Sequence, residues 1–161
     1  MILVTVGTAE PFDRLLAAVQ RLPVHEPIVA QCGSSSVRPA GARCLDYVPF
    51  ETLLELMRTA RAVVTHAGVG SVLTAFSAGK RPIVVPRLAS LGEAIDDHQL
   101  VFARRLSQAG LVTLADDETT LTEALVGLHA PVRQRRAAGR RLTSELRECL
   151  RATLGPAVGA P

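Results

Sequence analysis

Two hydrophobic patterns alternate along this chain. Short apolar runs rich in β-branched residues predict buried strands, and apolar residues spaced three to four apart predict amphipathic helices. The two patterns follow one another over nearly the whole length. Strands are predicted at 2–6, 27–31, 43–48, 62–64, 82–85 and 111–114, and helices at 11–22, 50–58, 68–78, 96–109, 118–128 and 132–150.

This alternation predicts an α/β fold. Strands that alternate with helices form βαβ units, so we expect a Rossmann-like, mainly parallel, six-stranded sheet flanked by helices on both faces. A chain of 161 residues has room for one core, and we place the domain at residues 1–154. Residues 155–161 have the Gly, Ala and Pro composition of a tail.

Ligands of such sheets bind beyond the carboxyl ends of the strands, which directs attention to four loops. These loops follow Val6, Gln31, Val64 and Pro86. Composition narrows the ligand class, because aromatic residues make up only 3% of the chain and Trp is absent. Binders of single-stranded nucleic acid use aromatic side chains to stack bases, so nucleic acid is not an expected partner.

The remaining composition predicts an intracellular protein. No apolar run approaches the roughly 20 residues that cross a bilayer, and Met1 opens directly into a predicted strand, without an export signal. Cys32, Cys44 and Cys149 are too few and too scattered for a disulfide framework or a metal clamp, so we expect buried thiols. The expected compartment is the cytoplasm.

Positive charge is concentrated near the carboxyl terminus, although the net charge is only +3. Lys80 is the only lysine, and the last 29 residues hold seven arginines. If the apolar residues of 132–150 face the core, these arginines form a solvated helix face. The alternative is docking on a membrane partner or on anionic headgroups, and the sequence leaves the choice open.

The loop between the predicted strand 62–64 and the next helix has the composition of an anion site. In His66-Ala-Gly-Val-Gly-Ser71 the helix begins near the glycines, so free N–H groups and the positive helix end face a bound anion. Gly68 and Gly70 permit close backbone approach, and the Ser71 hydroxyl adds a donor. This arrangement fits a diphosphate, while a tight turn that needs two glycines is the alternative.

Two common nucleotide motifs do not match this loop. A dinucleotide fingerprint would have a third glycine where Leu73 stands, and an acidic residue at the end of the next strand instead of Pro86 and Arg87. A P-loop requires GxxxxGK[ST], which neither glycine cluster provides. The sequence therefore disfavours ATP hydrolysis.

Six motifs follow one another in a fixed order: Val4-Thr-Val-Gly-Thr8, Pro11-Phe-Asp-Arg14, Thr65-His-Ala-Gly-Val-Gly-Ser71, Gly79-Lys-Arg-Pro82, Val84-Val-Pro-Arg87 and Gly92–Gln99 with its Asp-His-Gln. Over about residues 1–115 this set resembles the C-terminal domain of glycosyltransferase family 28. The group most similar in pattern contains the stand-alone catalytic subunit of the dolichol-pathway UDP-GlcNAc transferase and its bacterial exopolysaccharide counterparts.

This resemblance implies the donor-binding half of a GT-B enzyme. Such a chain binds a UDP-sugar and transfers a hexose-type sugar, with inversion, to a lipid-linked acceptor. A separate membrane-associated protein supplies the acceptor-binding half and recruits the chain to the inner face of the plasma membrane. The family requires no metal or other cofactor, because helix-end amides neutralise the leaving diphosphate, and UDP-sugar is the donor substrate.

The resemblance also assigns roles to residues in four segments of the chain, the first of them at the carboxyl end of the first predicted strand. These are Gly7 and Thr8, which face the diphosphate; Tyr47 and Val48, whose backbone pairs with uracil; Gly68, Gly70 and Ser71, the diphosphate turn; and His98 and Gln99, on the donor's sugar hydroxyls.

One position departs from the family pattern. Related transferases often place an acidic residue on the ribose hydroxyls, where this chain has Thr74. A threonine hydroxyl is a weaker partner for ribose, which leaves the nucleotide preference open. A nucleotide-binding regulatory or scaffolding module without catalysis is therefore the alternative function.

Several candidate residues have simpler explanations. His66 contacts the ligand or caps the following helix through a ring nitrogen. Asp96 and Asp97 suggest a metal pair, but adjacent carboxylates at a helix start more often serve as N-cap and first-turn charge, so no metal site is predicted. His98 and Gln99 are sugar ligands or exposed first-turn residues.

Three further side chains have open roles. Arg87 follows a strand and reaches either phosphate or solvent. Asp13 and His25 are not assigned as a general base, since the family's base comes from the acceptor half.

Apolar residues in the cleft-facing loops predict association. Phe50, Leu88 and Leu91 lie in loops that would face the second half of a GT-B cleft. If they stay unburied, they favour a homodimer when the partner is absent.

Overall fold

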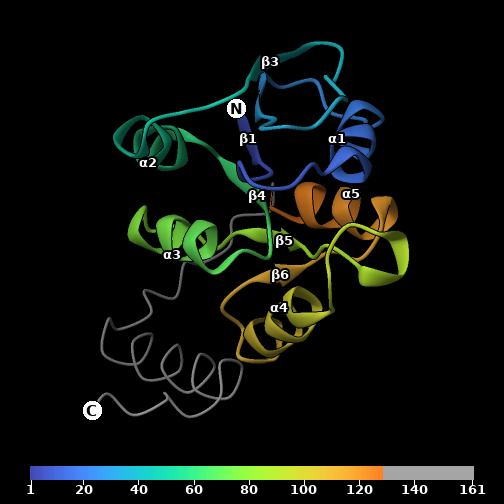
Figure 1. Cartoon of the computed structure of the whole chain (residues 1–161). Coiled ribbons are helices and arrows are strands. Elements are labelled where there is room, and N and C mark those ends of the chain that lie inside the picture. Colours follow the sequence, from blue (N-terminus) through green and yellow to red (C-terminus); the bar gives the residue numbers. More distant parts are fainter. Residues whose placement is uncertain (129–161) are drawn as a thin grey trace, which may run out of the picture.

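The computed structural model describes residues 1–128, which form one parallel sheet with helices on both faces (Figure 1). The sheet has six strands in the order β3-β2-β1-β4-β5-β6, and every neighbouring pair is parallel. The strands are β1 (Ile2–Thr5), β2 (Ile28–Gln31), β3 (Ala42–Leu45), β4 (Ala62–His66), β5 (Ile83–Val85) and β6 (Thr113–Leu114). The helices are α1 (Asp13–Gln20), α2 (Phe50–Thr59), α3 (Val69–Ser77), α4 (His98–Gln108) and α5 (Glu118–Gly127), with a 3₁₀ turn η1 (Ala89–Leu91). The predicted fold class and strand number are confirmed.

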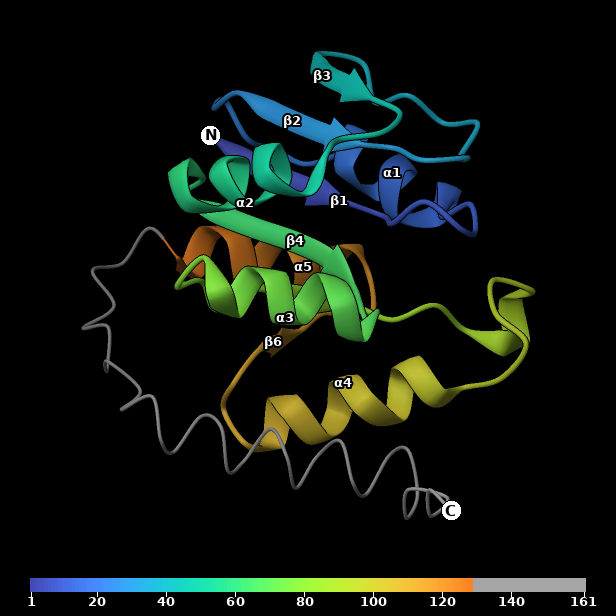
Figure 2. The same cartoon turned by 60° about the vertical axis from the view of Figure 1, so that its left-hand side comes forward.

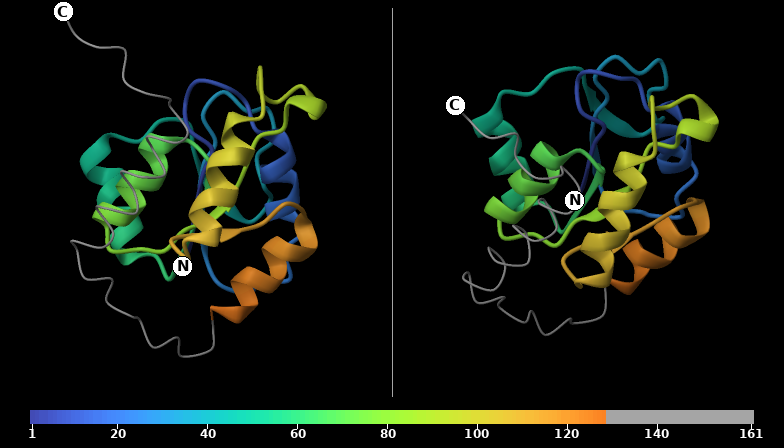
Figure 3. Two further views of the ribbon diagram at one scale, coloured as in Figure 1. Left: turned by 90° about the horizontal axis from the view of Figure 1, so that it is seen from below. Right: turned by 60° about the horizontal axis from the view of Figure 1, so that its bottom comes forward.

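Alternating residues of the strands divide the core between the two faces of the sheet. Val4 packs with Val64 and Ile83 against α1 and α5, whereas Leu3 and Val63 face α2 and α3. Figure 3 shows α1 and α5 on one side of the sheet and α2 and α3 on the other. Both faces are covered, which explains why the central strands are apolar at consecutive positions up to their polar carboxyl ends.

Register brings the carboxyl ends of the central strands to one edge. Thr5 of β1 pairs with Gln31 of β2 and Thr65 of β4, and all three side chains are buried. In Figure 2 the arrowheads of β1, β2 and β4 point to the edge where the long loop after β5 projects. The loops singled out in the sequence therefore meet at one place.

Element ends differ from the pattern in a few places. β3 ends at Leu45 and not at residue 48, because the chain turns away after its last pairing with Gln31. Helix α4 begins at His98, two residues later than predicted. The predicted helix 132–150, the arginine-rich segment, Cys149 and the boundary at 154 lie outside the described residues. Within residues 1–128, no helix is both long and apolar enough to cross a membrane.

Candidate functional site

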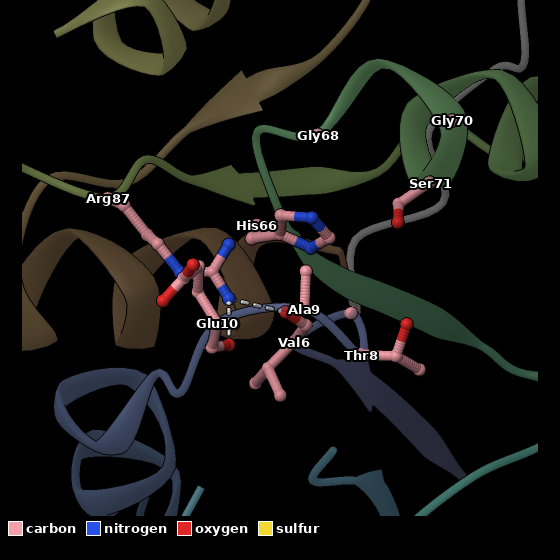
Figure 4. Close-up of a pocket in the computed structure, with 10 residues that line it drawn as sticks. Val6, Thr8, Ala9, Glu10, His66, Gly68, Gly70, Ser71 and Arg87 are labelled. Atoms are coloured by element: carbon pink, nitrogen blue, oxygen red, sulfur yellow. Dashed lines mark hydrogen bonds between the residues drawn. The ribbon is translucent and has the colours of Figure 1, made fainter. Parts of the chain in front are cut away.

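A pocket of about 270 Å³ opens at the carboxyl ends of β1, β4 and β5 (Figure 4). Three loops contribute to it: the loop after β1, the turn between β4 and α3, and the residues after β5. Its lining residues are Val6, Gly7, Thr8, Ala9, Glu10, His66, Gly68, Gly70, Ser71 and Arg87. Six of the eleven residues assigned from the sequence are therefore brought together here, namely Gly7, Thr8, His66, Gly68, Gly70 and Ser71.

The first turn of α3 presents unpaired donors to this pocket. Gly68 is the N-cap residue, and no side chain caps the helix. Among the described residues, nothing accepts a hydrogen bond from the backbone amides of Val69, Gly70 or Ser71. The positive end of the helix dipole and these amides favour an anion at this position.

A second set of unpaired amides comes from the loop after β1. Within residues 1–128, the N–H groups of Thr8, Ala9 and Glu10 have no acceptor. Successive free amides in a loop form a concave site for anions in the same way as a helix end does. Two independent groups of donors therefore line one pocket, which fits a ligand with two adjacent anionic groups.

The ring of His66 separates the two loops. A Cβ on Gly68 would lie 2.2 Å from its Nε2 atom and a Cβ on Gly7 would lie 2.8 Å from its Cε1 atom, so only glycine fits at either position. The Nδ1 atom is buried and has no hydrogen-bond partner among the described residues. Of the two roles that the sequence left open for His66, capping of α3 is not seen, because the helix has no side-chain cap bond; contact with a ligand stays a prediction.

Burial, together with the nearby positive charge of Arg87, lowers the pKa of His66 to about 4. The imidazole is therefore neutral at physiological pH and can accept or donate one hydrogen bond. A neutral ring keeps the pocket's positive charge on Arg87 and on the amide dipoles.

The low pKa of His66 predicts acid-sensitive stability. The unfolded chain takes up a proton near pH 6.5 that the folded chain binds only near pH 4, so the folded state loses stability as the pH falls through this range. The full difference corresponds to about 3 kcal/mol. Denaturant unfolding at pH 7.0 and pH 4.5 should show a smaller decrease for His66→Gln than for the unchanged chain. Equal decreases in the two proteins would contradict the prediction.

Tyr47 and Val48, the predicted uracil contacts, lie in the loop between β3 and α2 and do not line the pocket. Tyr47 is 71% exposed, whereas Val48 is buried. Gln31, a residue without an assigned role in the sequence, fixes this region. Its side-chain amide donates to the carbonyls of Gly7 at 3.0 Å and Asp46 at 3.1 Å, and thereby ties the β1 and β3 loops together. The sequence signal that could have identified Gln31 is a polar residue at the end of an otherwise apolar strand.

Thr74 lies one turn beyond Gly70 on α3. Its hydroxyl donates to the Gly70 carbonyl at 2.8 Å, so its hydrogen is already used inside the helix. The side chain is half-buried and lies outside the pocket lining. In this arrangement Thr74 offers a ligand only acceptor lone pairs.

His98 and Gln99 occupy the first turn of α4 and differ in exposure. His98 is exposed, and its ring contacts the Asp96 carboxylate. Gln99 is buried, and its Oε1 atom accepts a hydrogen bond from the Arg87 backbone amide at 3.2 Å. The alternative that both are exposed first-turn residues therefore holds for His98 and is wrong for Gln99. Neither side chain lines the pocket. Their assigned contacts with a donor sugar stay a prediction.

The two aspartates before α4 organise the backbone. Asp96 accepts from the His98 amide at 3.0 Å, and this bond lowers the pKa of Asp96. Asp97 accepts from the Ala89 amide at 3.0 Å and closes the loop after β5. Among residues 1–128, no three His, Cys, Asp or Glu side chains gather into a group that could hold a metal ion.

Asp13 and His25, which the sequence analysis did not assign as a general base, do not line the pocket. The Asp13 carboxylate accepts from the Val37 amide at 3.0 Å and the Ser36 hydroxyl at 2.9 Å, and the amide lowers the pKa of Asp13. His25 is exposed before β2, at the opposite edge of the sheet. Of the two described cysteines, Cys32 is buried as predicted and Cys44 is half-buried.

The sequence profile of the glycosyltransferase family 28 C-terminal domain matches residues 1–149. The chain belongs to this family. Curated relatives of this family 28 chain include the elloramycin glycosyltransferase ElmGT of Streptomyces olivaceus, which is 35% identical over 136 residues, covering 77% of this chain and 33% of that protein. The UDP-N-acetylglucosamine transferase subunit ALG13 of Yarrowia lipolytica is 32% identical over 124 residues, covering 66% of this chain and 60% of that protein.

Solved structures share the fold of this family 28 domain. The calicheamicin glycosyltransferase CalG4 has a TM-score of 0.61 at 22% identity, with 98% of this chain and 43% of that chain covered. SnogD from Streptomyces nogalater has a TM-score of 0.57 at 23% identity, with 95% and 42% covered. These neighbours are GT-B glycosyltransferases. The chain spans between a third and three fifths of the length of the first two curated relatives.

Proposed function

We propose that this family 28 chain is the donor-binding subunit of a UDP-sugar-dependent glycosyltransferase. It transfers a hexose-type sugar to a lipid-linked acceptor together with a membrane-associated, acceptor-binding partner. The observation that carries the proposal is the pocket in which the unpaired amides of Thr8–Glu10 and of Val69–Ser71 converge. A nucleoside diphosphate is the ligand whose two phosphates match two groups of donors.

The same amides explain how the subunit assists transfer. When the bond between the sugar and the diphosphate breaks, negative charge develops on the leaving phosphate. Donors held by the fold stabilise that charge without reorganising, which is the largest single contribution in many enzymes. The amides, together with the neutral His66, supply this stabilisation from the protein itself.

The proposal of a partner rests on a relative and on apolar side chains exposed on the described domain. A GT-B site lies between two Rossmann-like domains, and residues 1–128 form one of them. The relative ALG13 is itself named a subunit. Phe50, the first residue of α2, and Leu91, the last of η1, are 56% and 57% exposed, which suits a surface that a second chain covers. Recruitment by such a partner would hold the chain at the inner face of the plasma membrane.

A non-catalytic nucleotide-binding module is the second candidate. The observation that favours it is Thr74, whose hydroxyl hydrogen is bound to the Gly70 carbonyl. A site with a weak ribose contact can bind a nucleotide without fixing the position of its ribose. Regulation by nucleotide binding does not require the ribose to be fixed.

Calorimetric titration tests the nucleotide class. We expect UDP to bind, and the series UDP-GlcNAc, UDP-glucose and UDP-glucuronate to show which sugar is preferred. ADP and GDP are the matched controls, since they carry the same diphosphate on another base. No binding by any uridine nucleotide would contradict both candidate functions. Binding without sugar transfer in the presence of the acceptor half would favour the regulatory module.

A further inference from the structure

Arg87 is a buried cation beside the pocket. It lies two residues after the end of β5, and only 3% of the residue is exposed. Its Nη2 atom donates to the carbonyls of Val6 at 2.7 Å and Glu10 at 2.6 Å, and its Nε atom to that of Pro11 at 3.4 Å. Figure 4 shows one guanidinium nitrogen holding both dashed bonds while another points toward His66. The sequence left solvent as one destination for this side chain, but the structure instead holds Nε and Nη2 on carbonyls of the loop after β1.

The guanidinium has no counter-ion within the described residues. No ion pair of residues 1–128 includes Arg87. The Glu10 and Glu93 carboxylates favour its charge from a distance, and Glu93 is bound to Arg14. The centroid of the buried Phe12 ring lies 4.9 Å from the guanidinium carbon, a cation–π contact that stabilises the charge but does not neutralise it. A buried cation without a counter-ion is costly, so its presence here needs an explanation.

One end of the guanidinium remains free. In the described part of the chain, the Nη1 atom of Arg87 donates to no acceptor, although Nη2 and Nε are both engaged. The fully buried side-chain atoms of residues 1–128 that lack a hydrogen-bond partner are Thr65 Oγ1 and His66 Nδ1. Nη1 of Arg87 is not one of them, so it is accessible, and Arg87 lines the pocket. The guanidinium is therefore bound to the protein through Nε and Nη2 and is open to a ligand at Nη1.

We propose that Arg87 is a diphosphate-binding residue of this site, with Nη1 as the donor to the ligand. The inference rests on the proposed function and assigns its anion a specific counter-charge. Nη2 and Nε hold the carbonyls of the β1 loop, so the same side chain keeps that loop's amides turned to the pocket. The diphosphate then completes the charge balance of the buried guanidinium.

Substitution of Arg87 should therefore weaken the binding of ligands that carry phosphates and leave the binding of ligands without phosphates unchanged. Arg87→Met removes the charge and the fork, and it should weaken UDP binding by about 10–100-fold, the equivalent of one or two charged hydrogen bonds. Arg87→Lys keeps the charge but cannot bind the loop carbonyls and the ligand together, so its loss should be about tenfold. Uridine, which has no phosphate, should bind all three proteins within twofold.

NMR titration of the full chain with UDP and with uridine measures these affinities. The control is Arg21→Met, which removes one positive charge from an exposed ion pair with Glu118 and should leave UDP affinity within twofold. Equal UDP affinity in the Arg87 variants and the unchanged chain would overturn the inference and leave the proposed function standing. Parallel losses of UDP and uridine would also overturn it, because they indicate general damage to the site. Failure of the unchanged chain to bind UDP would instead reject the proposed function, and this inference with it.

A measurement on the unchanged protein covers the case in which the variants do not fold. The guanidinium ¹⁵N resonances of Arg87 should shift when UDP is added and stay in place with uridine. Unshifted resonances at saturating UDP would contradict the assignment.

Discussion

Gly70→Val is expected to abolish detectable UDP binding while the protein remains folded. Gly70 lies in the first turn of α3, lines the pocket, and has no neighbouring atom within 4 Å of the position of an added Cβ. A valine side chain therefore enters the pocket and not the core. It would displace the diphosphate from the free amides of α3, and the loss of two charged hydrogen bonds alone weakens binding by about 100-fold or more.

The reason for this effect is steric and not conformational. Gly70 is not among the positive-φ glycines of the described chain, so its backbone conformation does not exclude a side chain. The helix accepts a side chain at this position, so thermal unfolding should be nearly unchanged. UDP affinity within threefold of the unchanged chain, in a folded variant, would remove the turn from the site.

Gly68 provides the matched comparison. Its added Cβ would lie 2.2 Å from the His66 ring, so Gly68→Val must displace that ring and destabilise the turn. The two glycines are two residues apart and should separate binding from stability. Gly70→Val loses the ligand with little change in melting temperature, and Gly68→Val loses both.

Partner dependence is the second large effect. The isolated chain should show negligible sugar transfer, and activity should appear when a membrane-anchored, acceptor-domain protein is added. Within residues 1–128 the pocket lining offers one carboxylate, Glu10, and one imidazole whose pKa is near 4. A positioned base contributes roughly 10²–10⁴-fold, and in the proposed function the acceptor half supplies it.

Reconstitution with a lipid-linked acceptor and labelled UDP-sugar measures this dependence. The acceptor half alone and the chain alone are the controls, and sedimentation of the isolated chain shows whether it forms the homodimer that exposed Phe50 and Leu91 favour. Robust transfer by the purified chain without any partner would refute the prediction.

The sequence alone determined the architecture of residues 1–128. Apolar runs and helical spacing are local patterns, and in a doubly covered sheet the buried strands are mostly apolar, so the central strands of the sheet could be read directly. The glycine turn at Gly68 and Gly70 was also visible, because it joins a strand to a helix in consecutive residues. Such signals need no knowledge of which distant segments come together.

Tertiary structure alone decided the chemistry of the pocket. Arg87 and Val6 are 81 residues apart in sequence, and only parallel pairing around β4 places the guanidinium on the β1 loop. The same packing buries His66 and leaves its Nδ1 atom without a partner. The burial of a side chain, its charge balance and the pairing of its donors all depend on neighbours from several elements. The hydrophobic pattern along the sequence does not show which elements become neighbours.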